Sequence, residues 1–215
     1  GGGGARGVGV AGDGDGVLKE LEEKGGKAAK KRQQEALADE REAWQQRQTQ
    51  HTLIRIGRAR GYDVFVARND RNRVCHGELF AALTLPALPA MDLSDEVRQT
   101  VELIDVIWFV KGRSELACAF EVEQSTSIYS GILRMKDLAL SLPRNGAHFY
   151  LVAPEARERE VVAQMTRPAF SSEAPGFQLG YLPAGELSAN CDAMCRFGTD
   201  RSVLLKVARA HCMPP

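Results

Sequence analysis

Residues 104–123 read IDVIWFVKGRSELACAFEVE and predict a β-hairpin. Two runs rich in β-branched and aromatic residues, 104–110 and 116–123, flank the turn-forming residues KGRSE at 111–115. One face of these two strands carries eight apolar side chains and no charge, which predicts that it packs into a core. Those side chains are Ile104, Val106, Trp108, Val110, Leu116, Cys118, Phe120 and Val122.

The other face of the hairpin carries three acids at the end away from the loop. If Val110 pairs with Leu116, Asp105 lies opposite Glu121, with Cβ atoms about 5 Å apart. Glu123 lies two residues beyond Glu121 and therefore on the same face. A slip of one residue in this register would break the arrangement. The hairpin thus predicts three converging carboxylates.

Three converging carboxylates need a compensating positive charge or a proton. At low effective dielectric their repulsion is on the order of several kcal/mol. Carboxylate clusters of this kind bind Mg²⁺ or Mn²⁺, which prefer oxygen ligands. The alternative is that the acids form a solvated polar edge with Arg113 or Arg134 beside them.

The hairpin is flanked by further elements that periodicity and turn residues predict. A helix over roughly 49–60 precedes a strand at 62–67, with Gly61 as its C-cap. Residues 68–93 are expected to be a surface excursion, and Ser94 is expected to cap a short helix. After the hairpin we expect a helix at 127–142, a strand at 147–153, a helix at 155–166, a strand near 177–182 and a helix near 200–210.

Charge and composition are unevenly distributed along the chain. The 28 basic and 28 acidic residues cancel, but residues 27–60 carry nine Lys/Arg against four Asp/Glu, whereas residues 61–110 carry four against eight. Residues 1–26 hold 11 of the 21 glycines and are expected to be a disordered leader. No membrane span or secretory signal is expected.

The five cysteines are an odd number, which favours reduced thiols and a cytoplasmic location. A zinc site could be drawn from Cys191, Cys195, His211 and Cys212, but this spacing fits no common zinc module.

The acids and the order of elements resemble the PD-(D/E)xK nucleases, the restriction-endonuclease-like superfamily. Ile104-Asp105 matches the Asp position on the second core strand, and Glu121-Val122-Glu123 matches the Glu-x-Lys position on the third. The resemblance covers about residues 49–153. It implies an α/β protein with a mixed (α+β) sheet and an αβββαβ core. Glu123 replaces the usual Lys, and Leu53 lies where a further metal-associated Glu would be expected.

This resemblance implies an endodeoxyribonuclease that depends on Mg²⁺ or Mn²⁺. Asp105 and Glu121 would be the metal ligands. Glu123 would be a third metal contact or the general base. Contacts to nucleic acid would come from residues that follow or flank the acids. These are Ser125, Thr126, Ser127, Arg134, Arg58, Arg68 and Arg71. Capping of the following helix is an equally good interpretation of the hydroxyl groups.

The resulting domain organisation has four parts. These are the leader at 1–26, a basic helical segment at 27–60 that leads into the first core helix, the nuclease-like core at 49–153, and additions to the same domain at 154–215. We expect DNA as the partner of a restriction or defence endonuclease, and consider a homodimer and a further recognition domain or subunit. The alternative is a non-catalytic module, either nucleic-acid-binding or partner-docking, that retains the nuclease fold. The sequence leaves DNA versus RNA open.

Overall fold

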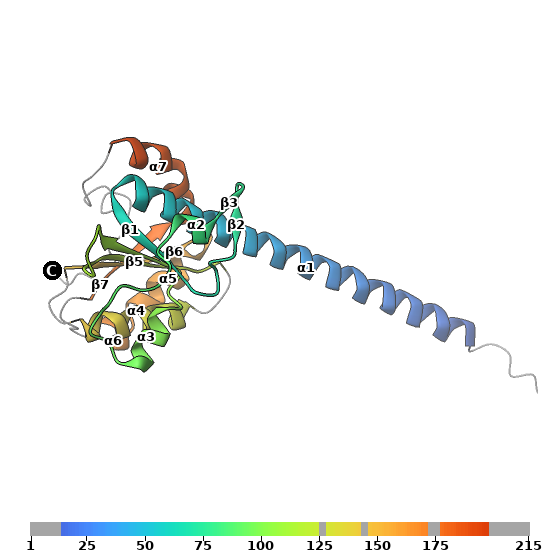
Figure 1. Cartoon of the computed structure of the whole chain (residues 1–215). Helices are drawn as coiled ribbons and strands as arrows, with labels where there is room; N and C mark the ends of the chain where they lie inside the picture. The colour runs from blue at the N-terminus through green and yellow to red at the C-terminus, as the bar shows by residue number, and fades with distance from the viewer. Residues whose placement is uncertain (1–13, 125–127, 143–145, 172–176, 198–215) are drawn as a thin grey trace, which may run out of the picture. The chain divides into compact units, whose positions relative to one another are not determined.

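The computed structural model describes residues 14–124, 128–142, 146–171 and 177–197 (Figure 1). It divides into two units, Gly1–Ala43 and Trp44–Pro215, and the helix α1 (Gly14–Ala59) continues from the first into the second. α1 begins within the stretch 1–26 for which we expected a leader. From residue 29 to Ala43 its side chains are exposed apart from the half-buried Glu42, in keeping with their charged and polar composition. No helix among the described residues is long and apolar enough to cross a membrane.

A five-stranded mixed sheet forms the centre of the second unit. Its strands lie in the order β1 (Tyr62–Val66), β4 (Val106–Val110), β5 (Leu116–Val122), β6 (His148–Ala153) and β7 (Gln178–Pro183). The pairs β1–β4 and β4–β5 are antiparallel, whereas β5–β6 and β6–β7 are parallel. The mixed sheet that we predicted is therefore confirmed, and so is the αβββαβ order, which runs α1, β1, β4, β5, α4 and β6.

Helices cover both faces of this sheet. α4 (Ile128–Ser141) buries Ile128, Ile132, Met135 and Leu138 at helical spacing, as predicted. The other helical elements are α2 (Phe80–Leu83), α3 (Asp95–Val101), η1 (Glu155–Arg157), α5 (Glu158–Met165), α6 (Pro168–Ser171) and α7 (Ala184–Phe197). Figure 1 shows α7 on one side of the sheet and α3, α4 and α6 on the other.

Buried apolar clusters on the two faces of the sheet hold these layers together. One cluster joins Leu53, Ile54 and Ile56 of α1 to Trp108, Phe120 and residues of α7. Another joins Ile107 and Phe109 to Met135 and Leu138 of α4, and a third joins α4 and α5 over β6 and β7. Both faces of β5 are consequently buried, including the face that carries the acids.

The predicted hairpin register is confirmed at the acid end and wrong at the loop end. Val106 pairs with Phe120 and Trp108 with Cys118, as expected. A β-bulge between Trp108 and Phe109 then shifts the register, so that Phe109, not Val110, pairs with Leu116. The extra residue reverses the local alternation. Leu116 therefore joins the α4 face and Ala117 the α1 face, opposite to our prediction.

Residues 68–93 are more than the surface excursion that we predicted. They contain a two-stranded hairpin, β2 (Val74–Cys75) and β3 (Glu78–Leu79), followed by α2. Cys75 and Phe80 are 1% and 0% exposed and belong to the core cluster on the α1 face. Tertiary packing of a few apolar residues thus overrides the turn-rich local sequence.

The ends and caps of the helices agree in part with those that we predicted from the sequence. Ser94 caps α3 by accepting a hydrogen bond from the Val97 amide at 3.3 Å, and Gly61 adopts a φ of 79° after α1. α7 was not predicted. The expected helix near 200–210 lies outside the described residues.

Candidate functional site

The three predicted acids lie at the end of the β4–β5 hairpin. Asp105 directly precedes β4, Glu121 lies on β5 and Glu123 follows it. Their exposed fractions are 8%, 0% and 3%, so all three are buried. Burial is the main cause that raises the pKa of both Asp105 and Glu121, and the nearby negative charge of Glu123 raises both further. The structure therefore brings the three side chains together in the interior and not on a solvated edge.

Asp105 is held by hydrogen bonds to both of its oxygens. The amide of Val122 donates to Oδ2 at 2.7 Å, and Nε2 of Gln50 donates to Oδ1 at 2.8 Å. The first bond links Asp105 to the strand that carries Glu121, and the second links it to α1. These bonds fix the orientation of the carboxyl group before any ligand binds.

A fourth acid, Asp70, joins the group through the same glutamine. Nε2 of Gln50 also donates to Asp70 Oδ2 at 2.6 Å, and Arg73 donates to Gln50 Oε1 at 3.2 Å. Arg73 completes the network with an ion pair to Asp70 at 2.9 Å. Asp70 is 6% exposed and Gln50 is 0% exposed. Gln50 thus holds two acids that are 35 positions apart in sequence.

Arg134 of α4 supplies the compensating charge at Glu121. Its Nε and Nη2 donate to the two carboxylate oxygens of Glu121 at 2.9 and 2.8 Å, a bidentate ion pair. A Cβ on Gly131 would lie 2.9 Å from Glu123 Oε1 and 3.3 Å from Glu121 Cβ. Glycine at 131 therefore lets α4 approach β5 closely enough for Arg134 to reach Glu121.

Burial dominates the ionisation of the two central acids. It raises the pKa of Asp105 to about 7, against lowering by the Val122 amide, and Asp70 and Glu123 raise it further. Burial also raises the pKa of Glu121 well above its usual value, although Arg134 opposes the shift. At neutral pH the group therefore carries less than its full negative charge.

The carboxylates have the ligand chemistry that a hard divalent cation prefers, but their oxygens are not clustered tightly enough to surround one. Their donors are all oxygens, which suit Mg²⁺ and Mn²⁺, and their charge is only partly compensated by Arg134 and Arg73. Both oxygens of Glu121 are engaged by Arg134. Among the described residues, the group whose ligand atoms all lie within 4.8 Å of one another is His51, Cys75 and His76, not the acids. Each of these oxygens keeps a second lone pair, but a cation bound there would lie beside the guanidinium charge of Arg134, so tight binding would require Arg134 to move away.

The residues that we predicted to contact nucleic acid do not all lie in the acid group. Arg134 lies in the acid group and is 26% exposed, whereas Ser125, Thr126 and Ser127 lie outside the described residues. Arg58 and Arg68 are exposed, and Arg68 pairs with Glu102 at 3.3 Å. Arg71 is half-buried and donates to the carbonyl of Pro86.

Sequence reasoning missed Gln50 and Asp70, and it considered Arg73 only as a cation that could follow the phosphate backbone. One pattern could have revealed Gln50, which shares the i, i+3, i+4 spacing of the buried face of α1 with Leu53 and Ile54. A polar residue at such a position requires a buried partner. We placed the position expected for a helix acid at Leu53, whereas the residue of α1 that contacts Asp105 is Gln50, about one turn earlier.

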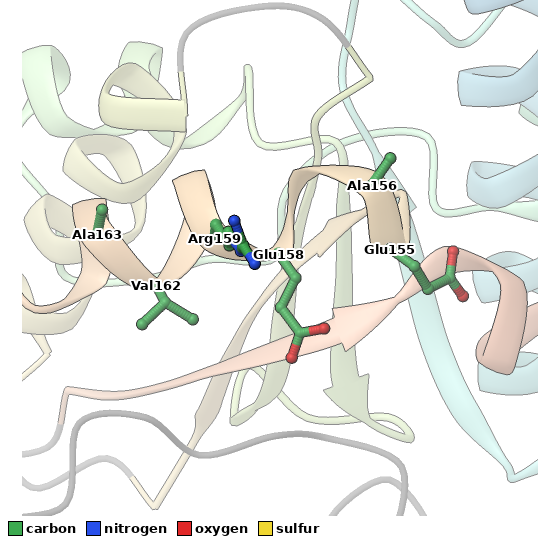
Figure 2. Close-up of a pocket in the computed structure, with 6 residues that line it drawn as sticks. All are labelled: Glu155, Ala156, Glu158, Arg159, Val162 and Ala163. Atoms are coloured by element: carbon green, nitrogen blue, oxygen red, sulfur yellow. The ribbon is translucent and has the colours of Figure 1, made fainter.

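A surface pocket elsewhere is unrelated to these acids. It has a volume of about 740 Å³ and is lined by residues of η1 and α5, among them Glu155, Glu158 and Arg159 (Figure 2). None of the four acids of the site lines it.

Comparison with known proteins gives two matches. The family model for the C-terminal domain of the type II restriction enzyme NmeDI matches residues 27–203. The chain is also 30% identical over 131 residues to the type II restriction enzyme NmeDI of Neisseria meningitidis serogroup C. That match covers 58% of this chain and 37% of the relative, so the chain matches little more than a third of the relative's length. No solved structure matches the chain.

Proposed function

This chain belongs to the family of the C-terminal domain of the type II restriction enzyme NmeDI, and we propose that it is a metal-dependent nuclease domain that cleaves DNA in a restriction or defence system. The observation that carries the proposal is the buried group of Asp105, Glu121 and Glu123 at the end of an antiparallel hairpin. We interpret it as a PD-(D/E)xK site in which Glu123 stands at the Lys position.

The proposed roles follow from how each side chain is held. Asp105 and Glu121 would bind Mg²⁺ or Mn²⁺, because they come from adjacent strands and their carboxyl groups are buried near each other. When bound, the metal supplies a Lewis acid that polarises the scissile phosphate and lowers the pKa of a bound water. Gln50 keeps Asp105 oriented. Glu123 would accept the proton of the attacking water or contact the metal.

Arg134 would have two partners in this scheme. In the metal-free protein it compensates Glu121, and its 26% exposure leaves part of the guanidinium open to solvent. On binding of nucleic acid, a phosphate would compete with Glu121 for it, since Arg binds both groups in the same bidentate geometry. Release of Glu121 would then free oxygens for the metal. Arg58 and Arg68, which are exposed, would contact the DNA backbone.

DNA cleavage by the full chain tests the proposal. We expect supercoiled plasmid to be nicked or linearised with Mg²⁺ and to stay intact with EDTA. Asp105→Asn and Glu121→Gln should each lower the rate at least about 100-fold, the scale of one lost charge-stabilising contact. Glu115→Gln is the matched control, because Glu115 lies beside the same hairpin but its side chain is 58% exposed. Undiminished cutting by Glu121→Gln would refute the site, and preferential cutting of RNA would correct the substrate.

A second candidate function is a non-catalytic module that binds nucleic acid or a partner protein. The observation that favours it is the bidentate Arg134–Glu121 pair, which engages both oxygens of a metal ligand that the nuclease mechanism needs. This candidate predicts DNA binding that weakens with salt, with no Mg²⁺-dependent strand breakage by the wild-type chain. A homodimer or a further recognition subunit is also proposed, and light scattering in the presence and absence of DNA would detect it.

A further inference from the structure

We propose that His51, Cys75 and His76 form a second metal site, specific for zinc or a similar transition metal, with Glu78 as the fourth ligand. His51 lies on α1, whereas the other three residues lie in the β2–β3 hairpin. The imidazole and thiol ligand atoms of the first three residues all lie within 4.8 Å of one another. This group shares no residue with the carboxylate site.

The donor set selects the metal. Sulfur and imidazole nitrogen are the ligands that zinc prefers, whereas Mg²⁺ prefers oxygen. Glu78 lies next to these three ligands, since its Oε2 is 2.7 Å from Nε2 of His51, and its 49% exposed side chain can rotate toward the metal. Two histidines, one cysteine and one carboxylate supply four ligands, the number that structural zinc sites use. The thiol of Cys75 is reduced and 1% exposed, and His51 is 4% exposed. The site is thus closed toward the core and open at His76.

The turn of the hairpin has positive φ angles, and this backbone conformation places His76 beside the other ligands. His76 and Gly77 form the two-residue turn between Cys75 and Glu78, and their φ angles are 50° and 78°. Such turns favour Asn-Gly, and among the described residues His76 is the one non-glycine at positive φ. A strained backbone of this kind persists where the surroundings enforce it, often at ligand sites. The histidine side chain there points back to α1, where its Nε2 lies 2.7 Å from Gln48 Oε1.

A metal here would support the carboxylate network. His51 is the neighbour of Gln50, and Cys75 lies two residues after Arg73, which bonds Gln50 and Asp70. Coordination would therefore tie α1 to the segment that carries Asp70. The site is structural in this view, because it adds a cross-link between α1 and a hairpin whose β2–β3 ladder is only two residues long on each strand.

Metal binding to the full chain tests the proposal independently of nuclease activity. After removal of metal by chelation and dialysis under reducing conditions, titration with Zn²⁺ should show one tight equivalent by calorimetry. Co²⁺ should give the intense tetrahedral d–d bands and the thiolate-to-cobalt charge-transfer band of a cysteine-bound ion. Cys75→Ser should remove the charge-transfer band. His51→Gln should weaken Zn²⁺ binding by more than the roughly 10–100-fold that outer-shell changes cause.

Two variants separate ligation from folding. His76→Gly removes the imidazole ligand and should therefore lower Zn²⁺ affinity. Because glycine adopts the positive φ of this position without strain, the metal-free variant should stay folded. Cys191→Ser removes another buried cysteine, on α7, and should leave the cobalt spectrum unchanged. A charge-transfer band that survives Cys75→Ser, or the absence of a tight Zn²⁺ equivalent in the wild-type chain, would overturn the proposal.

Discussion

Replacing Arg134 by methionine tests the electrostatic account of the carboxylate group. Glu121 is 0% exposed and its two oxygens accept only charged hydrogen bonds from Arg134 among the contacts described above. Removal of one partner of a buried ion pair costs about 3–5 kcal/mol. Arg134 is 26% exposed, and burial already raises the pKa of Glu121, so the carboxyl group can take up a proton when Arg134 is absent. We therefore expect a loss of about 3 kcal/mol at pH 8 and a smaller loss at pH 6.

Urea unfolding without metal measures this loss, with the fluorescence of the buried Trp108 as the probe. Arg113→Met is the matched control, because Arg113 is 70% exposed and lies 3.6 Å from Glu115. It should change the unfolding free energy by no more than about 0.5 kcal/mol. The double variant Arg134→Met/Glu121→Gln should recover part of the loss, since no buried charge is left without a partner.

Mg²⁺ provides the second half of the test. In Arg134→Met both oxygens of Glu121 are free, so Mg²⁺ should bind more tightly than to the wild-type protein. At a hundredfold excess over the dissociation constant it would stabilise the variant by about 2.7 kcal/mol. The reasoning would be refuted by a variant as stable as the wild type at pH 8 without metal, or by equal Mg²⁺ affinities in the two proteins.

Three further predictions concern other contacts of this region. Gly57→Ala should cost roughly 1–3 kcal/mol in thermal or urea unfolding, because the new Cβ would lie 2.6 Å from Trp108 Nε1. Gly146→Ala, with open space around the new Cβ, should cost much less, and equal effects would contradict this. Gln50→Leu removes a donor to two buried acids and should cost about 1–3 kcal/mol, with a matching loss of DNA cleavage if the proposed function holds. Burial raises the pKa of Asp105 from 3.8 to about 7, so between these pH values the metal-free folded protein keeps a proton that the unfolded chain releases. The unfolding free energy should therefore fall as pH rises from about 4 to 7. Asp105→Asn should flatten this pH dependence in urea titrations.

The hairpin and its acids could be predicted because they depend on local alternation. Between Val106 and Trp108 the register follows from the positions of apolar side chains alone, and it brings Asp105 and Glu121 together. The helix order could be predicted for the same reason, since α4 repeats its apolar residues at helical spacing. A bulge has no signature in such a pattern, and the loop-end pairing was therefore wrong.

The rest of the site depends on contacts between distant segments. Gln50 and Asp105 are 55 positions apart, and no spacing rule joins them. Arg134 is one of two cations on α4, and only the packing of Gly131 against β5 places it beside the acids. The other, Lys136, donates instead to the carbonyl of Ala169.

The bulge between Trp108 and Phe109 makes the hairpin suitable for engineering. It takes up one residue of offset within the strands, so the shifted pairing at the loop end leaves the pairing beside Asp105 and Glu121 in register. The loop at 111–115 is exposed and lies at the opposite end of the strands. A short epitope, a fluorophore or an affinity peptide could therefore be grafted between Gly112 and Ser114 for imaging or immobilisation, with the carboxylate group left in its original alignment.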